Sequence, residues 1–481
     1  MYSDATTSAS NRSLKYAALL TPALLLILLA GAVLFFKERM LYIDAPHILF
    51  RLINDGHFWI EQDRYGSFIS QLLPLAGARL HMPLLWLMLL YSASFYLFFL
   101  TVSLVLVFSY RNYGLAILMG LYFTLFISDT YYWPNNEVHQ GIAWMFLAFA
   151  ANFFAASKKR NTLLLTVLFT VSFFLCIWTH PLVMLAAVYL WFFFMVDKNT
   201  WPYTKTQSIV LSVILLVLSY IKFYQGQHNW YDGGKLEMVT QFQFSKIKTV
   251  LHSPQLRFFI HSCLYQYRIF SLLFITGLAG LLLNKKYLLF VWTLIFVCGY
   301  LLLTSITFWD VSLRSYLESE YAPLVIICAA PFVYYVLPKI KAGYSVALFT
   351  AIFLLRIACI YNASAPFTER VAIMQGIGDK MKERHLTKVI ITEPSPGIDS
   401  ALIMNWAAPV ESIYISQLKG EIPQRTFIFL DPTQIKAADT TVKNLLLGAF
   451  EKRPASRLNA YYFQMDTATT YRVFSYTTLM E

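Results

Sequence analysis

The chain has 481 residues, of which 58% are hydrophobic and only 13% are charged. A soluble domain carries about twice that share of charged residues, so the composition excludes a soluble globular protein and indicates a polytopic membrane protein. In a soluble protein the formal net charge of +12 would suggest nucleic acid, but in a membrane protein basic residues first report topology, and we expect no nucleic-acid partner.

Apolar runs that can form membrane-spanning helices recur over the first three quarters of the chain. A helix needs about 20 residues to cross the hydrocarbon core. The run 14–36 stays apolar beyond the cleavage-like sequence at 30–32, so it predicts a first helix and not a removed signal peptide. About eleven spans are predicted in this way, at 14–36, 83–110, 114–128, 141–156, 162–178, 182–196, 208–224, 262–284, 287–306, 322–337 and 344–361.

The charges of the connecting loops predict the orientation of these spans. Basic residues gather in alternate loops, and the outer loops 37–82, 129–140, 225–261 and 307–321 hold nearly all the remaining acids of this region. By the positive-inside rule the N-terminus is cytoplasmic, and an odd number of spans places the C-terminus outside. The basic residues of the predicted inner loops are Arg111, Lys158, Lys159, Arg160, Lys198, Lys205, Lys285, Lys286, Lys339 and Lys341.

The composition changes after residue 362, and residues 363–481 hold no apolar run of spanning length. Alternation of β-like and helical patterns predicts a small α/β domain here. We therefore expect two domains: an α-helical polytopic membrane bundle, 1–362, and an extracytoplasmic α/β domain, 363–481. The predicted strands are 388–392, 412–416, 426–430, 461–465 and 471–476, and the predicted helices are 367–384, 397–408 and 433–450.

The first outer loop contains two amphipathic stretches, which predict helices lying on the membrane surface. In a helix that starts near Asp44, residues Asp44, His47, Arg51 and Asp55 share one face. An acid that faces a shallow cavity there is partly desolvated, so its pKa rises and it can act as a general base. The alternative is that these charges only mark the interface, with Arg51 paired to Asp55. The second helical stretch is 63–80.

The second outer loop, SDTYYWPNNEVHQ, repeats this combination of acids and a histidine. Asp129, Asn136, Glu137 and His139 lie between two short spans, where a buried carboxylate is costly and is usually functional. The alternative is an ordinary turn in which Asn136 caps the next helix. If the two loops converge, Asp44, Asp129 and Glu137 offer acid–base chemistry or a site for a divalent metal ion.

Basic residues in and near the later outer loops are candidate phosphate ligands. Arg314 precedes a helix, and a guanidinium binds phosphate oxygens in a bidentate way. An ion pair with Glu318, four residues on, is the alternative. Lys235 lies among aromatic residues in the large loop 225–261, where basic residues suit anionic lipid, and the alternative is that it only anchors the chain at the interface. Arg268 lies in or near a span.

This arrangement resembles the GT-C superfamily of integral-membrane glycosyltransferases, which includes protein O-mannosyltransferases and lipid A aminoarabinose transferases. The resemblance is carried by Asp44 in YIDAPH, Glu137 in PNNEVHQ and Arg314 before EYAP. It implies transfer of a sugar from a polyprenyl-phosphate carrier to a glycan, lipid or protein outside a bacterial inner membrane. It also implies Asp44 as general base, Glu137 orienting the acceptor or a metal ion, and Arg314 with Arg268 or Lys235 on the carrier phosphate.

Two other functions fit a polytopic chain. A transporter or lipid flippase would place ionisable residues near the middle of the bilayer and have duplicated halves. The predicted spans are nearly free of ionisable groups, which gather in the outer loops instead. A membrane-anchored binding protein is the third possibility, although it does not need this many spans. The pattern therefore favours chemistry at the outer surface.

Overall fold

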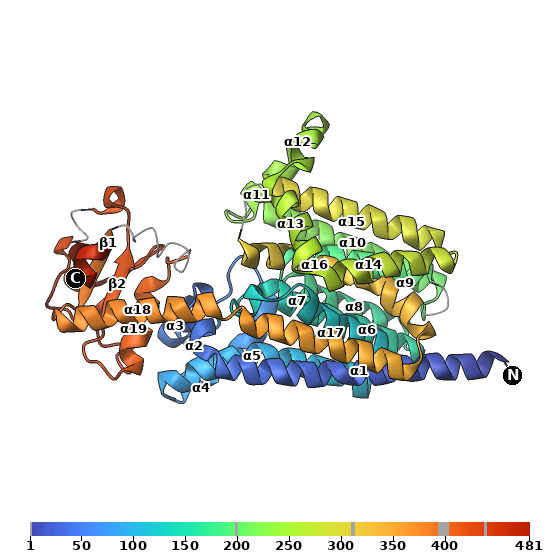
Figure 1. Ribbon diagram of the computed structural model, residues 1–481, viewed down its shortest axis with the longest axis horizontal. Helices are drawn as coiled ribbons and strands as arrows, with labels where there is room; N and C mark the ends of the chain where they lie inside the picture. The colour runs from blue at the N-terminus through green and yellow to red at the C-terminus, as the bar shows by residue number, and fades with distance from the viewer. Residues whose placement is uncertain (1, 198–200, 309–312, 393–403, 437–439) are drawn as a thin grey trace.

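The computed structural model describes residues 2–197, 201–308, 313–392, 404–436 and 440–481, and the side chains from residue 12 on. Seven described helices are long and apolar enough to cross a membrane, the last of them continuing from α17 into α18. They lie side by side in a bundle, with the C-terminal domain at the end opposite the N-terminus (Figure 1). The helices concerned are α1 (Tyr2–Leu34), α5 (Leu84–Leu104), α7 (Glu137–Ser157), α10 (Lys205–Gln227), α15 (Tyr287–Thr307), α16 (Arg314–Pro331) and α17 (Ala342–Asn362).

Shorter helices complete the bundle. Helices α13 and α14 meet at an angle of 88°. Neither is long enough to cross a membrane alone, but together they are long and apolar enough for one broken span. Each span predicted from the sequence falls on a helix or, for 262–284, on this bent pair, but α6, α8 and α9 have only 13, 16 and 16 residues. The number of eleven crossings therefore stays a prediction. The shorter helices are α6 (Tyr113–Leu125), α8 (Thr162–Ile177), α9 (Pro181–Val196), α11 (Gly233–Thr240), α12 (Ile247–Leu251), α13 (Pro254–Tyr265) and α14 (Arg268–Leu283).

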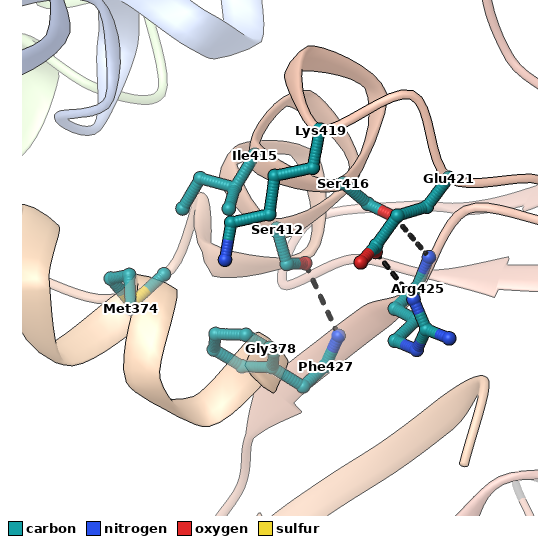
Figure 2. A pocket seen from close by; sticks show the side chains of 9 residues that line it. All are labelled: Met374, Gly378, Ser412, Ile415, Ser416, Lys419, Glu421, Arg425 and Phe427. Carbon is teal, nitrogen blue, oxygen red and sulfur yellow. Dashed lines mark hydrogen bonds and ion pairs between the residues drawn. The ribbon is translucent and has the colours of Figure 1, made fainter. Parts of the chain in front are cut away.

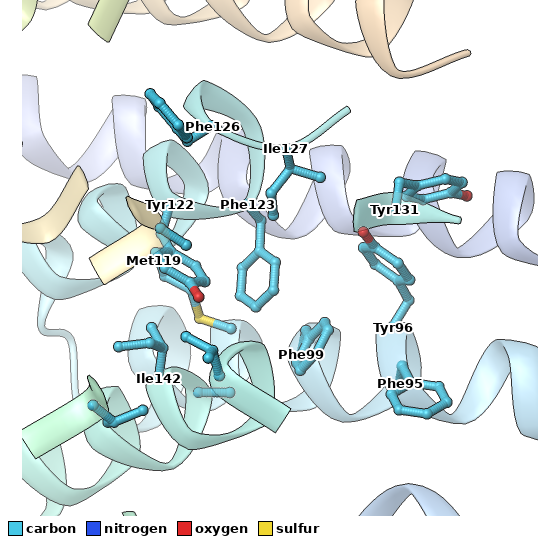
Figure 3. Close-up of a cluster of buried hydrophobic side chains, with 14 of the residues drawn as sticks. Phe95, Tyr96, Phe99, Met119, Tyr122, Phe123, Phe126, Ile127, Tyr131 and Ile142 are labelled. Atoms are coloured by element: carbon cyan, nitrogen blue, oxygen red, sulfur yellow. The ribbon is translucent and has the colours of Figure 1, made fainter. Parts of the chain in front are cut away.

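Helix α6 lies at the centre of the bundle, and every residue from Gly114 to Leu125 is buried. Aromatic side chains of α5 and α6 pack against each other (Figure 3), and the ring centroids of Phe99 and Phe123 lie 4.3 Å apart. A Cβ atom at Gly120 would lie 2.6 Å from the hydroxyl of Thr21. Glycine at this position thus lets α1 pack directly against α6 and anchors the first helix to the core.

The C-terminal domain contains a three-stranded parallel sheet in the order β2-β1-β5 and a two-stranded antiparallel sheet, β3-β4. This confirms strands at 388–392, 426–430 and 471–476, and α18 confirms the helix predicted at 367–384. The elements are α18 (Ala365–Glu383), β1 (Lys388–Thr392), α19 (Ala408–Leu418), β2 (Thr426–Phe429), β3 (Leu445–Leu447), β4 (Lys452–Pro454), β5 (Arg472–Ser475) and α21 (Tyr476–Met480).

Three predictions for this domain are wrong. Residues 412–416 belong to α19, and residues 461–465 form a turn with one isolated bridge. The described part of 433–450 holds β3 and only short helical pieces, at 433–434 and 440–441, in place of one long helix. The stretch SIYIS alternates like a strand, but Pro409 starts a helix and all residues from Ala408 to Ser416 are buried, so tertiary packing decides. Residues 437–439, 397–403 of the predicted helix 397–408, and Lys198 lie outside the described residues.

The loop predicted to be the first outer loop forms α2 (Phe36–Met40), α3 (Asp44–Asp55) and α4 (Phe68–Arg79), so both predicted helices are confirmed. Protein covers the apolar face of α3, which was expected to rest on the membrane surface. Phe50 packs on Phe463 with ring centroids 5.2 Å apart, and the Tyr414 hydroxyl donates to the carbonyl of Pro46 at 3.1 Å. The C-terminal domain thereby fixes the helix that begins with Asp44.

Candidate active site

A cavity of about 640 Å³ lies where α3, the N-terminal ends of α7 and α9, α11, α16 and the C-terminal domain meet. Small-molecule sites in proteins typically have volumes of about 300–1,000 Å³. Asp44 and Glu137, which come from the loops 37–82 and 129–140, both line this cavity. The convergence of the two loops expected from the sequence is therefore present in the fold.

Asp44 is the first residue of α3 and is half-buried at the cavity wall. The indole Nε1 of Trp133 donates a hydrogen bond to its Oδ2 at 2.6 Å. Burial and the negative charge of Glu137 raise the pKa of Asp44 to about 7, although the Trp133 hydrogen bond acts in the opposite direction. A carboxyl with this pKa can take up a proton near neutral pH, as a general base must.

Glu137 differs from Asp44 because it is ion-paired. Its Oε2 lies 2.8 Å from Nη1 of Arg64, whose Nη2 lies 3.5 Å from Oδ1 of Asp232. The guanidinium also lies 5.6 Å from the ring centroid of Tyr231. This arrangement fixes Glu137 as a hydrogen-bonding group at the cavity wall and leaves Asp44 as the better base. Arg64 was not predicted, since a lone arginine in a polar loop carries no sequence signal.

Lys235 lines the same cavity from α11. Its ammonium lies 4.3 Å from the ring centroid of Tyr231 and 4.7 Å from that of Phe308, and among the described residues no carboxylate pairs with it. Burial lowers the pKa of Lys235. A desolvated ammonium between aromatic rings gains stabilisation from a bound anion, so Lys235 is the best placed of the predicted phosphate ligands.

His47 and Arg51 also line the cavity, on the same face of α3 as Asp44. Arg51 forms the ion pair with Asp55 that was the alternative prediction, at 3.8 Å, and a closer one of 2.6 Å with Glu451 of the C-terminal domain. His47 lies 3.9 Å from a carboxylate oxygen of Glu61. Arg51 therefore connects the cavity wall to the C-terminal domain, and His47 does so through the ring of Trp406, 5.4 Å away.

Four predicted binding residues lie outside the cavity lining, namely Arg314, Arg268, Asp129 and His139. Arg314 pairs with Asp129, and Glu318, its expected partner, instead accepts hydrogen bonds from the backbone N–H groups of residues 128 and 130. Arg268 is exposed, and its Nε donates to the carbonyl of Leu264 at 3.1 Å. Arg314, Arg268 and Asp129 therefore do not line this cavity, and their contacts with a substrate stay predictions.

The residues around the start of α7 divide between structure and site. Asn136 caps α7 by accepting from the N–H of Val138 at 3.2 Å, which confirms the alternative prediction, and it also lines the cavity. His139 is buried below the cavity wall, with Nδ1 2.8 Å from the hydroxyl of Tyr122. His139 is thus a core residue and does not contact the cavity.

The candidate metal ligands do not form a cluster. Asp44 and Glu137 face the cavity, but Asp129 is paired with Arg314, and no group of three ligating side chains occurs in the part of the chain that the structure describes. A divalent ion prefers several oxygen ligands around one point. The described residues of this cavity do not fit such an ion.

A second hollow in the C-terminal domain, between α18, α19 and β2, measures only about 10 Å³ (Figure 2). Arg425 in its lining pairs with Glu421, and Ser412 accepts from the N–H of Phe427 at 3.2 Å. This volume holds no more than a water molecule. The hollow is therefore a packing feature of the domain.

Comparison with protein-family models, with curated proteins and with solved structures gave no match for this chain. The resemblance to the GT-C superfamily accordingly stays a prediction.

Proposed function

We propose that this protein is a membrane glycosyltransferase of the GT-C type, which moves a sugar from a polyprenyl-phosphate carrier to an extracytoplasmic acceptor. The observation that carries the proposal is the single cavity that holds Asp44, with its pKa raised to about 7, and the Lys235 ammonium. One group is suited to remove a proton from an acceptor and the other to receive a phosphate. Glycosyl transfer from a lipid phosphate requires both.

The apolar part of the cavity supports a lipid carrier. Leucine and methionine side chains of α9, α11 and α15 line the same cavity as Lys235. A prenyl chain gains about 25 cal/mol for each Å² of apolar surface that it buries against such a wall. In this arrangement the prenyl chain lies toward the bundle and its phosphate contacts Lys235. The residues of this apolar wall are Leu182, Met184, Leu185, Leu236 and Leu303.

The reaction follows from these positions. Asp44 takes the proton from the acceptor hydroxyl as its oxygen forms a bond to the anomeric carbon of the donor sugar. The bond between that carbon and the phosphate oxygen breaks, and its electron pair leaves with the lipid phosphate. Lys235 neutralises the charge that develops on the phosphate. Glu137, fixed by Arg64, accepts a hydrogen bond from the acceptor and orients it.

The proposal includes a topology. About eleven crossings, a cytoplasmic N-terminus and an outer C-terminus put the cavity on the extracytoplasmic side of a bacterial inner membrane. In Figure 1 the N-terminus lies at the end of the bundle away from the C-terminal domain, as this orientation requires. The lipid-linked donor is then reached from the outer leaflet.

The test is a transfer assay with the full chain in nanodiscs, a panel of polyprenyl-phosphate sugars labelled in the sugar, and cell-envelope extract as acceptor. Asp44→Asn should lower the transfer rate at least about 100-fold, because loss of a general base costs about 10²–10⁴ in rate. Asp63→Asn is the matched control, since Asp63 lies exposed in the same loop and outside the cavity lining. Asp63→Asn should keep the wild-type rate.

Two results would contradict the proposal. Full turnover by Asp44→Asn would remove Asp44 from the role of base. Movement of the carrier across sealed vesicles, with no label transferred from any donor of the panel, would favour the lipid flippase instead.

A further inference from the structure

The cavity has a second end, formed by the C-terminal domain and distinct from the apolar end near Lys235. Trp406 and Phe450 line this end, together with His47 of α3. The ring of Trp406 meets His47 edge-on at 5.4 Å and Phe450 at 5.0 Å. A smaller cavity of about 30 Å³ is lined by the same three residues and by others of the C-terminal domain. Aromatic rings at this end are thus available to a ligand from outside, with Phe450 72% exposed.

The charged groups at this aromatic end are paired with each other. Arg51 lies 2.6 Å from Glu451, and Arg453 lies 3.1 Å from Asp55. Glu61 accepts from the indole N–H of Trp59 at 2.7 Å while its side chain stays 40% exposed. This end therefore offers hydrogen-bonding carboxylates and aromatic faces. Both of its arginines, Arg51 and Arg453, are already paired with carboxylates, so neither is available to bind a phosphate.

We propose that this aromatic end, formed by Trp406, Phe450, His47 and Glu61, is a subsite for a carbohydrate acceptor. Sugar C–H groups carry a small positive charge and pack on the electron-rich face of an aromatic ring. Sugar hydroxyls pair with exposed carboxylate oxygens such as those of Glu61. An anionic lipid headgroup needs unpaired cations, and Lys235 lies among the apolar residues of the cavity, not at this end. The two ends thus separate acceptor from donor, with Asp44 and Glu137 on the wall of the same cavity.

The inference rests on the proposed function for the direction of transfer, but its test measures binding alone. The full chain in nanodiscs, labelled with a fluorophore, is applied to an array of neutral, amino and acidic glycans, with a peptide array in parallel. The wild type should retain a defined glycan class. Phe450→Ala and Trp406→Ala should each weaken that binding about tenfold, which is the contribution of one aromatic contact.

Ile422→Ala is the matched control, because Ile422 is 71% exposed in the same domain and lines neither cavity. It should bind glycans like the wild type. Binding to peptides instead of glycans, or no retention of any glycan by the wild type, overturns the subsite. So does wild-type binding by both Phe450→Ala and Trp406→Ala. A third outcome separates the two proposals. If the wild type binds glycans and these variants do not, but no sugar is transferred in the transfer assay, the subsite is supported and the glycosyltransferase activity is contradicted.

Discussion

At the scale of single residues, two neighbours, Glu137 and Trp133, shift the pKa of Asp44 in opposite directions. Burial and the charge of Glu137 raise the pKa of Asp44 from an ordinary 3.8 to about 7, and the hydrogen bond from Trp133 lowers it. Because the folded-state pKa lies above the ordinary value, Asp44 favours folding only while it is protonated. That contribution is complete below about pH 4 and is lost as the pH rises through about 7. Above about pH 7, where Asp44 is ionised and can act as a base, its carboxylate therefore lowers the free energy of unfolding.

Trp133→Phe tests this balance. The variant removes the donor that stabilises the carboxylate of Asp44, so the pKa should rise further. A hydrogen bond to a charged group is worth about 1.5–3 kcal/mol, which corresponds to a shift of about one to two pH units. We expect the acidic limb of the kcat/KM profile, near pH 7 in the wild type, to move to higher pH by that amount. An unchanged limb with a uniformly lower rate would mean that Trp133 only shapes the cavity.

At the scale of elements, the turn before α3 holds Asp44 in place through the C-terminal domain. Ile43 has φ +44°, a conformation that a β-branched residue rarely adopts and that costs about 1–3 kcal/mol. Its N–H donates to Oε1 of Glu411 at 3.0 Å, and Arg370 donates to the carbonyl of Leu41. Glu411 and Arg370 are buried and paired at 2.7 Å. Residues of α18 and α19 thus stabilise a backbone conformation that the loop would not keep alone.

Glu411→Gln should break this support. The amide oxygen can still accept from Ile43, but the guanidinium of Arg370 loses its counter-charge in a buried position, which costs about 3–5 kcal/mol. Asp379→Asn is the control, because Asp379 pairs with Lys419 at an exposed position and should cost about 1 kcal/mol or less. Chemical denaturation of the two variants measures the difference. Equal stabilities would show that the buried pair does not support the turn.

The elements also explain how far the sequence was informative. Apolar runs and the Asp44-His47-Arg51-Asp55 spacing predicted the helices, because burial on one face follows from local periodicity. The cavity could not be predicted in the same way, because its polar residues come from distant segments, such as Arg64, His180, Lys235 and Glu320. Arg314 and Asp129 were predicted as separate binding groups, and only the fold reveals that they pair with each other.

At the scale of the whole molecule, the basic loops meet at one end of the bundle. Lys286 lies 3.5 Å from Asp197, and Lys339 donates to the side chain of Asn284 at 2.6 Å. These contacts join three loops that were predicted to be cytoplasmic. The cavity lies at the opposite end, next to the C-terminal domain. Such a separation of basic loops from the cavity is expected of a protein whose site faces away from the cytoplasm.

Cysteine labelling of intact cells tests this orientation. After replacement of the exposed Cys298 and Cys359 by alanine, single cysteines are introduced as Ile422→Cys in the C-terminal domain and Arg160→Cys in the loop after α7, both at exposed positions. An impermeant maleimide should label position 422 in intact cells and position 160 only after permeabilisation, because the positive-inside rule keeps the basic loop in the cytoplasm. Labelling of position 160 in intact cells, with protection of 422, would invert the bundle. The cavity would then face the cytoplasm, where soluble nucleotide-sugars are available and a polyprenyl-phosphate donor is not required.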